Sequence, residues 1–186
     1  EPVRRIRPVN DGGQRLPNEE RDHPRNMEQI LEDGYELATV AGRGFGPDPQ
    51  SPEYSHIAGD ITGAYTEKVE AVSRSMVTLN LQDDRYPSAL VVYDRVVAAD
   101  PSFRKTWLLH SIQEPRIEGS TTTVVRDEEG YEGEGRYFGK LEARTLLPEA
   151  VKIRKIGGPG KEFWVESTGV NYPATPRSPA FEPGAW

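Results

Sequence analysis

Two long runs of strand-forming residues, separated by a turn, constrain the fold of this chain more than any other feature. Residues 68–81 and 89–97 are rich in Val, Leu, Thr and Tyr, and the intervening Asp83–Pro87 is a turn sequence. In the second half of the first run, residues of one face alternate with residues of the other: Val77, Leu79 and Leu81 against Met76, Thr78 and Asn80. This period of two is typical of a half-buried strand. We therefore expect the two runs to pair as an antiparallel hairpin.

Further strand-like segments recur along the chain without helices between them. We expect strands at 37–41, 105–112, 121–126, 139–147, 151–156 and 162–166, a Gly/Pro loop at 42–52 and an exposed acidic hairpin loop at 127–135. Such a succession predicts an all-β, antiparallel fold. Packing of two sheets as a β-sandwich is the arrangement we expect, because it buries two apolar faces.

The two ends of the chain differ in composition from its middle. Residues 1–35 are polar and interrupted by turn signals, with one short helix expected near 26–33. Residues 173–186 are rich in proline. The sequence therefore predicts an irregular N-terminal segment (1–35), an antiparallel β-sandwich domain (36–172) and an extended Pro-rich tail (173–186).

Charge and composition exclude several classes of partner. The formal net charge is −7 and the sequence pI is about 5.1, which argues against nucleic acid and anionic membranes as partners. An anionic polysaccharide stays possible, since it needs only a local basic patch. The chain has no cysteine, so disulfides and thiolate metal sites are excluded. It begins Glu1-Pro2-Val3-Arg4 without Met or an apolar leader, and we expect it to begin inside a longer product.

The three histidines lack the spacing of a metal or catalytic motif. His110, in an apolar strand-like run, is either a ligand or general base or a partly buried histidine bonded to a carbonyl, and we favour the latter. His56 lies near Glu53 and Asp60, which form either a cation site or, as we favour, strand-edge and turn positions. His23 is expected to be solvated.

Neither the carboxylates nor the glycine-rich turn define an active site. Asp94, Glu114 and Glu142 are candidates for the two carboxylates of a glycoside hydrolase, but their spacing selects no pair and surface charge explains them better. Residues 157–161 lack the spacing of a phosphate-binding loop and predict a tight turn between strands. The acidic stretch 127–134 matches no calcium loop. The residues alone therefore predict an antiparallel β domain without an identifiable active site.

Six stretches, taken in order, carry a resemblance to a known family. They are NDGGQR (10–15), PEYSHIAGDITGAY (52–65), VVYDRVVAADPSFRKTWLLHS (91–111), TLLP (145–148), IGGPGKEFWV (156–165) and NY (171–172). Together they resemble the C-terminal portion of heparinase II/III-type polysaccharide lyases. The resemblance implies a parent enzyme in which an α/α toroid packs against β-sandwich domains. It also implies β-elimination on a uronic acid-containing polysaccharide, in which a base removes the C5 proton and an acid protonates the leaving oxygen.

The resemblance assigns no catalytic residue, metal ligand or cofactor to this chain. The family's catalytic Tyr and one His belong to the toroid, and its second His and structural zinc ligands belong to motifs that precede NDGGQR. None of these motifs occurs here. The resemblance does place Asn10, Asp11, Gln14 and Arg15 as substrate-binding candidates near the cleft, with Arg15 positioned to pair with a sulfate or carboxylate. The competing interpretation, which we favour, is a turn that holds two strands.

Three hypotheses about function follow. The first is a lyase segment, inactive alone, of an enzyme secreted or exported to the bacterial periplasm, with an anionic polysaccharide and the missing toroid and metal-site strands as partners. The second is a non-catalytic carbohydrate-binding β-sandwich, with stacking rings among Trp107, Trp164, Tyr93 and Tyr137, although most of these are expected in the core. The third is a structural β module without a ligand.

Overall fold

A computed structural model of the chain describes residues 25–32, 37–129, 135–161, 163–166, 168–172 and 186. Most of the expected N-terminal segment and Pro-rich tail lies outside these residues. The chain divides between Lys105 and Thr106 into two compact units. We call them the N-terminal unit, which contains Val9–Lys105, and the C-terminal unit, which contains Thr106–Trp186.

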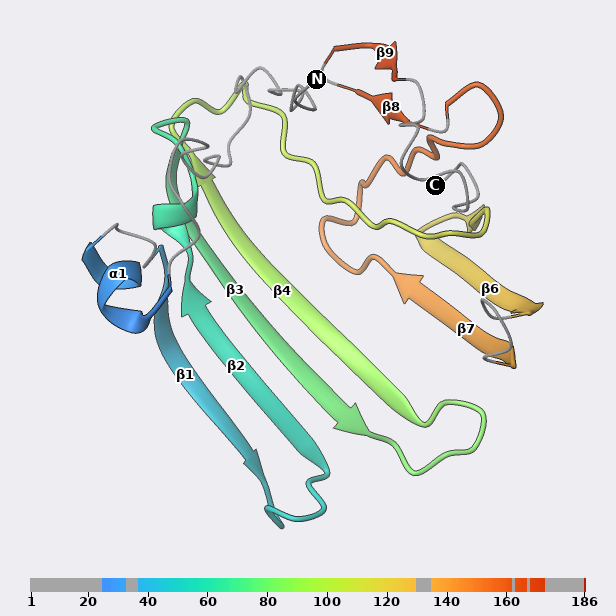
Figure 1. The fold of residues 1–186 in the computed structure, drawn as a ribbon, viewed down its shortest axis with the longest axis horizontal. Helices are drawn as coiled ribbons and strands as arrows, with labels where there is room; N and C mark the ends of the chain where they lie inside the picture. The colour runs from blue at the N-terminus through green and yellow to red at the C-terminus, as the bar shows by residue number, and fades with distance from the viewer. Residues whose placement is uncertain (1–24, 33–36, 130–134, 162, 167, 173–185) are drawn as a thin grey trace. The chain divides into compact units, whose positions relative to one another are not determined.

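The N-terminal unit contains an antiparallel sheet of four strands in chain order (Figure 1). Its described strands are β1 (Thr39–Gly46), β2 (Tyr54–Asp60), β3 (Val69–Asn80) and β4 (Ser88–Ala98). The short helix predicted near residue 26 is confirmed as α1 (Met27–Glu32), and a single 3-10 turn, η1 (Thr62–Ala64), lies between β2 and β3. The prediction of an antiparallel β fold is therefore confirmed.

The hairpin β3–β4 forms as its residues predict. Val77 lies opposite Val91 and Met76 lies opposite Val92, so the two alternating sets of side chains point to opposite faces. Asp83 closes the turn, because its Oδ1 accepts the backbone N–H of Arg85 at 2.8 Å. Local sequence signals were sufficient here, since both strands and their turn are contiguous in the chain.

Strand β1 occupies part of the segment expected to be a Gly/Pro loop, and β2 was not predicted. The glycines of β1 lie beneath rings from β2, which explains both errors. A Cβ atom on Gly44 would lie 3.0 Å from Cε1 of His56, and one on Gly46 would lie 3.2 Å from the hydroxyl oxygen of Tyr54. Glycine is therefore required here for a close approach within a sheet and not for a turn.

The C-terminal unit contains two further antiparallel sheets (Figure 1). One pairs β5 (Arg116–Glu118), β6 (Thr121–Glu129) and β7 (Arg136–Arg144), and the other pairs β8 (Trp164–Val165) with β9 (Val170–Asn171). The acidic residues 127–129 belong to β6 and not to a loop, because they continue its pairing with β7; residues 130–134 lie outside the described part of the chain.

The strands predicted at 105–112 and 151–156 are wrong: neither segment is a strand in the structure. Trp107, Leu108 and Ile112 are all exposed, so the apolar residues of the first segment do not occupy a sheet face. Strand propensity reflects packing against neighbouring strands, and a segment with suitable residues but no neighbouring ladder stays outside a sheet.

The core of the N-terminal sheet lies under β3. Among the described residues, Val72 is the only buried hydrophobic side chain, at 2% exposure. The register places it on the face that also carries Arg74, Met76, Ile57, Phe45, Leu90, Val92, Asp94 and Val96, which we call the Val72 face. The opposite face, called the Tyr93 face, carries Tyr93, Arg95, Val91, Val77, Leu79, Ser73, Ser75, His56 and Tyr54. Large apolar side chains are exposed on both faces.

Candidate functional site

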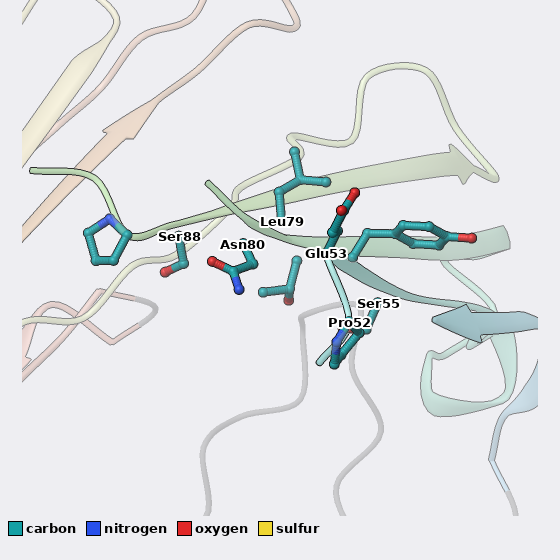
Figure 2. A pocket seen from close by; sticks show the side chains of 9 residues that line it. Pro52, Glu53, Ser55, Leu79, Asn80 and Ser88 are labelled. Carbon is teal, nitrogen blue, oxygen red and sulfur yellow. The ribbon is translucent and has the colours of Figure 1, made fainter. Parts of the chain in front are cut away.

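A shallow hollow of about 190 Å³ lies at one end of the N-terminal sheet (Figure 2). Three segments build it: the start of β2, the end of β3 and the start of β4. The backbone N–H of Asn80 donates to the carbonyl of Glu53 at 2.8 Å, and that of Leu81 donates to the carbonyl of Pro87 at 3.0 Å. The lining residues are Pro52, Glu53, Tyr54, Ser55, Thr78, Leu79, Asn80, Pro87 and Ser88.

The chemistry of the hollow suits hydrogen bonding and not acid–base catalysis. Hydroxyl and amide groups from Ser55, Thr78, Asn80 and Ser88 line it, and Glu53 is the one carboxylate among the lining residues. The amide oxygen of Asn80 already accepts the backbone N–H of Gln82 at 3.3 Å. The volume lies below the range of roughly 300–1,000 Å³ that holds a drug-sized ligand. The hollow is therefore too small for a drug-sized ligand, and its hydroxyl and amide groups are of the kind that hydrogen-bond a small polar group.

The Tyr93 face presents a second candidate surface. Tyr54 is 43% exposed and Tyr93 is 55% exposed, and the register places both rings on this face of the sheet. Arg95 lies on the same face and is also exposed. Exposed aromatic faces and a cation are the groups that bind the apolar face and the acidic substituents of a uronate sugar.

An ion pair on the Val72 face accounts for one of the candidate carboxylates. Arg74 and Asp94 lie opposite each other in the β3–β4 register and form a bidentate pair, with Nε–Oδ1 at 2.6 Å and Nη2–Oδ2 at 2.7 Å. The hydrogen bonds that Arg74 donates to Asp94 raise the pKa of Arg74 against the opposing effect of its partial burial. Asp94 is therefore a sheet-stabilising anion. Arg74 was not predicted as a partner of Asp94, although two opposite charges at hairpin spacing were a signal for this pair.

The other two candidate carboxylates also bind cations in the C-terminal unit. Glu142 pairs with Lys140 at 2.9 Å, and Glu114 pairs with Lys155. Each carboxylate thus has a cation of its own, as the interpretation of surface charge predicts, and the structure provides no reason to pair any two of them as a hydrolase dyad.

The histidines that the structure describes do not form a site. His56 lies exposed on β2 above Gly44, and Asp60 is four residues further along the same strand, about 13 Å away at 3.3 Å per residue. Within the described ranges, no group of three or more His, Cys, Asp or Glu residues gathers to hold a metal ion. His110 is exposed and outside any strand, so the prediction of a partly buried histidine on a strand is wrong.

The predicted substrate-binding residues Asn10, Asp11, Gln14 and Arg15 lie outside the described residues, as does His23. Their roles stay predictions.

The aromatic residues differ from expectation in one case. Trp107, expected in the core, is 58% exposed, because its segment joins no sheet. Trp164 is half-buried, and its indole N–H donates to Oε2 of Glu166 at 2.9 Å. The side chain of Tyr137 lies outside the description.

A contact around Trp186 was not anticipated. Ser111 and Trp186 exchange two backbone hydrogen bonds, of 2.9 and 2.7 Å. The Trp186 ring lies against Gly158, and the ammonium of Lys155 is 5.2 Å from the ring centroid. Trp186 therefore joins the segment after Lys105 to the glycine turn at 157–160. The turn itself is confirmed by the hydrogen bond from Lys161 N–H to the Gly158 carbonyl at 2.8 Å.

Two exposed aspartates give the N-terminal unit a dependence on pH. The hydroxyl and backbone N–H of Thr62 hold the pKa of Asp60 below its ordinary value, and Ser102 does the same for the pKa of Asp100. A lowered pKa in the folded state means that these bonds stabilise the fold above the unfolded pKa of about 3.9, and that this stabilisation is lost as pH falls through the folded pKa.

We expect the double variant Asp60→Asn, Asp100→Asn to lose less stability than the parent chain between about pH 7 and about pH 3. Asparagine keeps the acceptor oxygen but does not titrate. Urea unfolding followed by far-ultraviolet circular dichroism at both pH values measures the difference. Equal losses in the two proteins would contradict the assignment.

Comparisons place the chain in no family. No helix in the portions that the structure describes has the length and apolar character needed to cross a membrane. Protein-family models and curated proteins were both compared with the chain, and none matches it.

Proposed function

We propose that the chain is part of the β region of a polysaccharide lyase of the heparinase II/III type, that it supports one wall of the substrate cleft, and that it is inactive alone. The observation that carries the proposal is the order of the six stretches that resemble this family over most of the chain. The antiparallel β architecture agrees with the β region that such an enzyme requires.

The positions of the resembling stretches support a common scaffold. The stretch 52–65 covers β2 and η1, and the stretch 91–111 begins inside β4. The stretch 156–165 covers the glycine turn and β8. Part of the similarity therefore falls on strands and on turns, while residues 99–111 and 145–148 lie outside the strands.

In the same proposal, the N-terminal sheet is one layer of a β-sandwich, with its Val72 face covered by a second sheet. Phe45, Ile57 and Leu90 are exposed on this face, which also carries the exposed Arg43, the paired Arg74 and Asp94 and several small polar residues. Burial of apolar surface contributes about 25 cal/mol per Å². A sheet with apolar residues on both faces gains this energy by packing against another layer.

In the proposed enzyme, this chain binds and positions substrate, while residues elsewhere transfer the protons. Tyr54 and Tyr93 offer stacking surfaces, and Arg95 offers a cation to a uronate carboxylate or a sulfate. A cation near the uronate also favours the carbanion that forms when the C5 proton leaves.

A second candidate function is a non-catalytic carbohydrate-binding module. The specific observation in its favour is that Tyr54 and Tyr93 are exposed on one face of one sheet together with Arg95. Stacking rings on a flat sheet face bind sugars without any catalytic group.

Incubation of the chain with a panel of uronate polysaccharides (heparan sulfate, chondroitin sulfate, hyaluronan and alginate) is expected to give no ultraviolet absorbance from unsaturated uronate. A clear signal from a sample free of any other chain would contradict the proposal that this segment is inactive. The coding region upstream is expected to encode the family's α/α toroid and the motifs that carry its second His and zinc ligands, and their absence would overturn the lyase assignment.

Calorimetric titration with the same polysaccharides tests the sugar-binding surface that both functions share, and the upstream coding region distinguishes the two functions. Binding of uronate polymers that weakens when Tyr93 is changed to Ala, together with an upstream region lacking the lyase motifs, would favour the binding module. A neutral glucan is the control for the role of Arg95, because it lacks the acidic groups that a guanidinium binds.

A further inference from the structure

Strand β4 is a regular edge strand of the N-terminal sheet (Figure 1). It pairs with β3 from Ser88 to Val97 without a register shift, whereas the other edge strand, β1, is interrupted by a bulge between Val40 and Gly42. Bulges protect sheet edges from further pairing, while long regular edge strands offer a template for another strand.

The hydrogen bonds at both ends of the β3–β4 hairpin show which backbone groups of β4 point outward. The N–H of Leu81 donates to the Pro87 carbonyl, and the N–H of Ala99 donates to the Lys68 carbonyl. Since hydrogen-bonded pairs alternate along an antiparallel ladder, the odd-numbered residues of β4 form their backbone hydrogen bonds with β3. The N–H and C=O groups of the even-numbered residues between 88 and 96 therefore point away from the sheet. In the described part of the chain, these groups have no hydrogen-bond partner.

The sequence of β4 is nearly symmetric about Asp94, with two valines at each end of the segment 91–97. Residues 91–97 read Val-Val-Tyr-Asp-Arg-Val-Val, with Asp94 at the centre. An antiparallel copy paired about Asp94 places Val92 opposite Val96 of the second copy and Val91 opposite Val97 of the second copy. It also places Tyr93 opposite Arg95 of the second copy, a favourable pairing of a ring with a guanidinium.

This register also matches the outward backbone groups. Val92, Asp94 and Val96 are the residues whose N–H and C=O point away from β3, and in the register centred on Asp94 they face one another. Each such pair can exchange two backbone hydrogen bonds. A shift of the centre to Val92 would instead place Leu90 opposite Asp94.

The two central aspartates do not oppose the pairing, because each is neutralised within its own sheet. Arg74 binds both carboxylate oxygens of Asp94 from the neighbouring strand, at 2.6 and 2.7 Å. Without Arg74, two carboxylates directly opposite each other would repel.

From these observations we propose that two copies of this chain pair through β4, antiparallel about a twofold axis at Asp94, to form one continuous sheet. The interface is isologous, since each copy contributes the same residues. The proposal goes beyond the proposed function and does not depend on it, because it rests only on the edge of β4 and its sequence.

Sedimentation of the chain from micromolar to millimolar concentration is expected to show a monomer–dimer equilibrium. Val92→Pro removes an outward N–H that β3 does not use, so the sheet is retained while two symmetry-related hydrogen bonds of the dimer are lost. The dimer dissociation constant is expected to rise about 30-fold or more.

Arg43→Pro is the matched control. The N–H of Ile61 donates to the Val72 carbonyl and the N–H of Asn80 donates to the Glu53 carbonyl, so the odd-numbered residues of β2 form their backbone hydrogen bonds with β3. The even-numbered residues of β2 therefore bond to β1, and His56 pairs with Gly44. The N–H of the adjacent residue, Arg43, then points away from the sheet. This variant carries the same kind of change on the opposite edge and is expected to leave the dissociation constant unchanged. Circular dichroism of both variants reports whether the sheet is intact.

Cysteine crosslinking tests the register directly, since the chain has no cysteine of its own. A mixture of Tyr93→Cys and Arg95→Cys chains is expected to form disulfide-linked heterodimers, because non-hydrogen-bonded partners have Cα atoms about 4.5 Å apart. Either variant alone is expected to crosslink far less. A monomeric parent chain at every concentration, an undiminished dimer in Val92→Pro, or crosslinking of Tyr93→Cys only with itself would each overturn the proposal.

Discussion

Replacement of Gly158 by alanine is expected to destabilise the C-terminal unit by about 2–4 kcal/mol, from backbone strain and overpacking together. Gly158 has a φ of +73°, a left-handed conformation that alanine adopts at a cost. A Cβ atom would also lie 2.5 Å from the Cη2 and Cζ2 atoms of Trp186. The ring would have to move, with loss of its contact to the ammonium of Lys155.

Gly160→Ala separates the two causes. Gly160 has a similar φ of +80°, but a Cβ there would meet nothing within 4 Å. This variant should lose only the strain energy, about 1–2 kcal/mol. All three tryptophans (Trp107, Trp164 and Trp186) lie in the C-terminal unit, so urea unfolding followed by tryptophan fluorescence reports on this unit alone. Equal losses in both variants would show that the Trp186 contact contributes nothing.

Replacement of Val72 by alanine is expected to cost the N-terminal unit about 2 kcal/mol. The side chain is 2% exposed, and each buried methylene equivalent contributes about 0.8 kcal/mol before the energy of the cavity is added. The backbone should stay in place, because Thr62 Oγ1 accepts the N–H of Val72 at 3.0 Å and Val72 pairs with Val96.

Val91→Ala is the matched control for this change. This change removes the same two methyl groups from a residue on the neighbouring strand. Because Val91 is 48% exposed, its replacement should lower the free energy of unfolding by less than about 1 kcal/mol. Because the N-terminal unit contains no tryptophan, hydrogen exchange of peptides that cover β3 and β4 is the appropriate measurement. Similar protection in the two variants would mean that Val72 is not the centre of the core.

Elements formed by neighbouring stretches of the sequence were predicted correctly more often than elements that depend on residues far away in the sequence. The β3–β4 hairpin was predicted because its strands are adjacent and Asp83 marks the turn between them. The start of β1 was predicted as a strand, but its residues 42–46 were taken for a loop, since their glycines are explained only by the rings of Tyr54 and His56 on another strand. The ion pair of Arg74 with Asp94 was missed for the same reason, because it depends on register.

The candidate surfaces were less predictable than the fold. The hollow combines residues from three separate segments, and the shared exposure of Tyr54 and Tyr93 follows from the alignment of β2, β3 and β4. A sequence shows which side chains alternate along one strand but not which strand lies beside it.

By itself, the sequence determined that the chain forms antiparallel strands, that β3 and β4 pair, and that no metal or catalytic motif is present, because these properties depend on residue type and short-range spacing. Only the tertiary structure decided that residues 42–46 form a strand and that residues 105–112 do not. It also decided which face of the sheet holds the ion pair and which groups of β4 point outward. The physical reason is that a strand is stabilised by hydrogen bonds and side chains of its neighbours, which lie far away in the sequence.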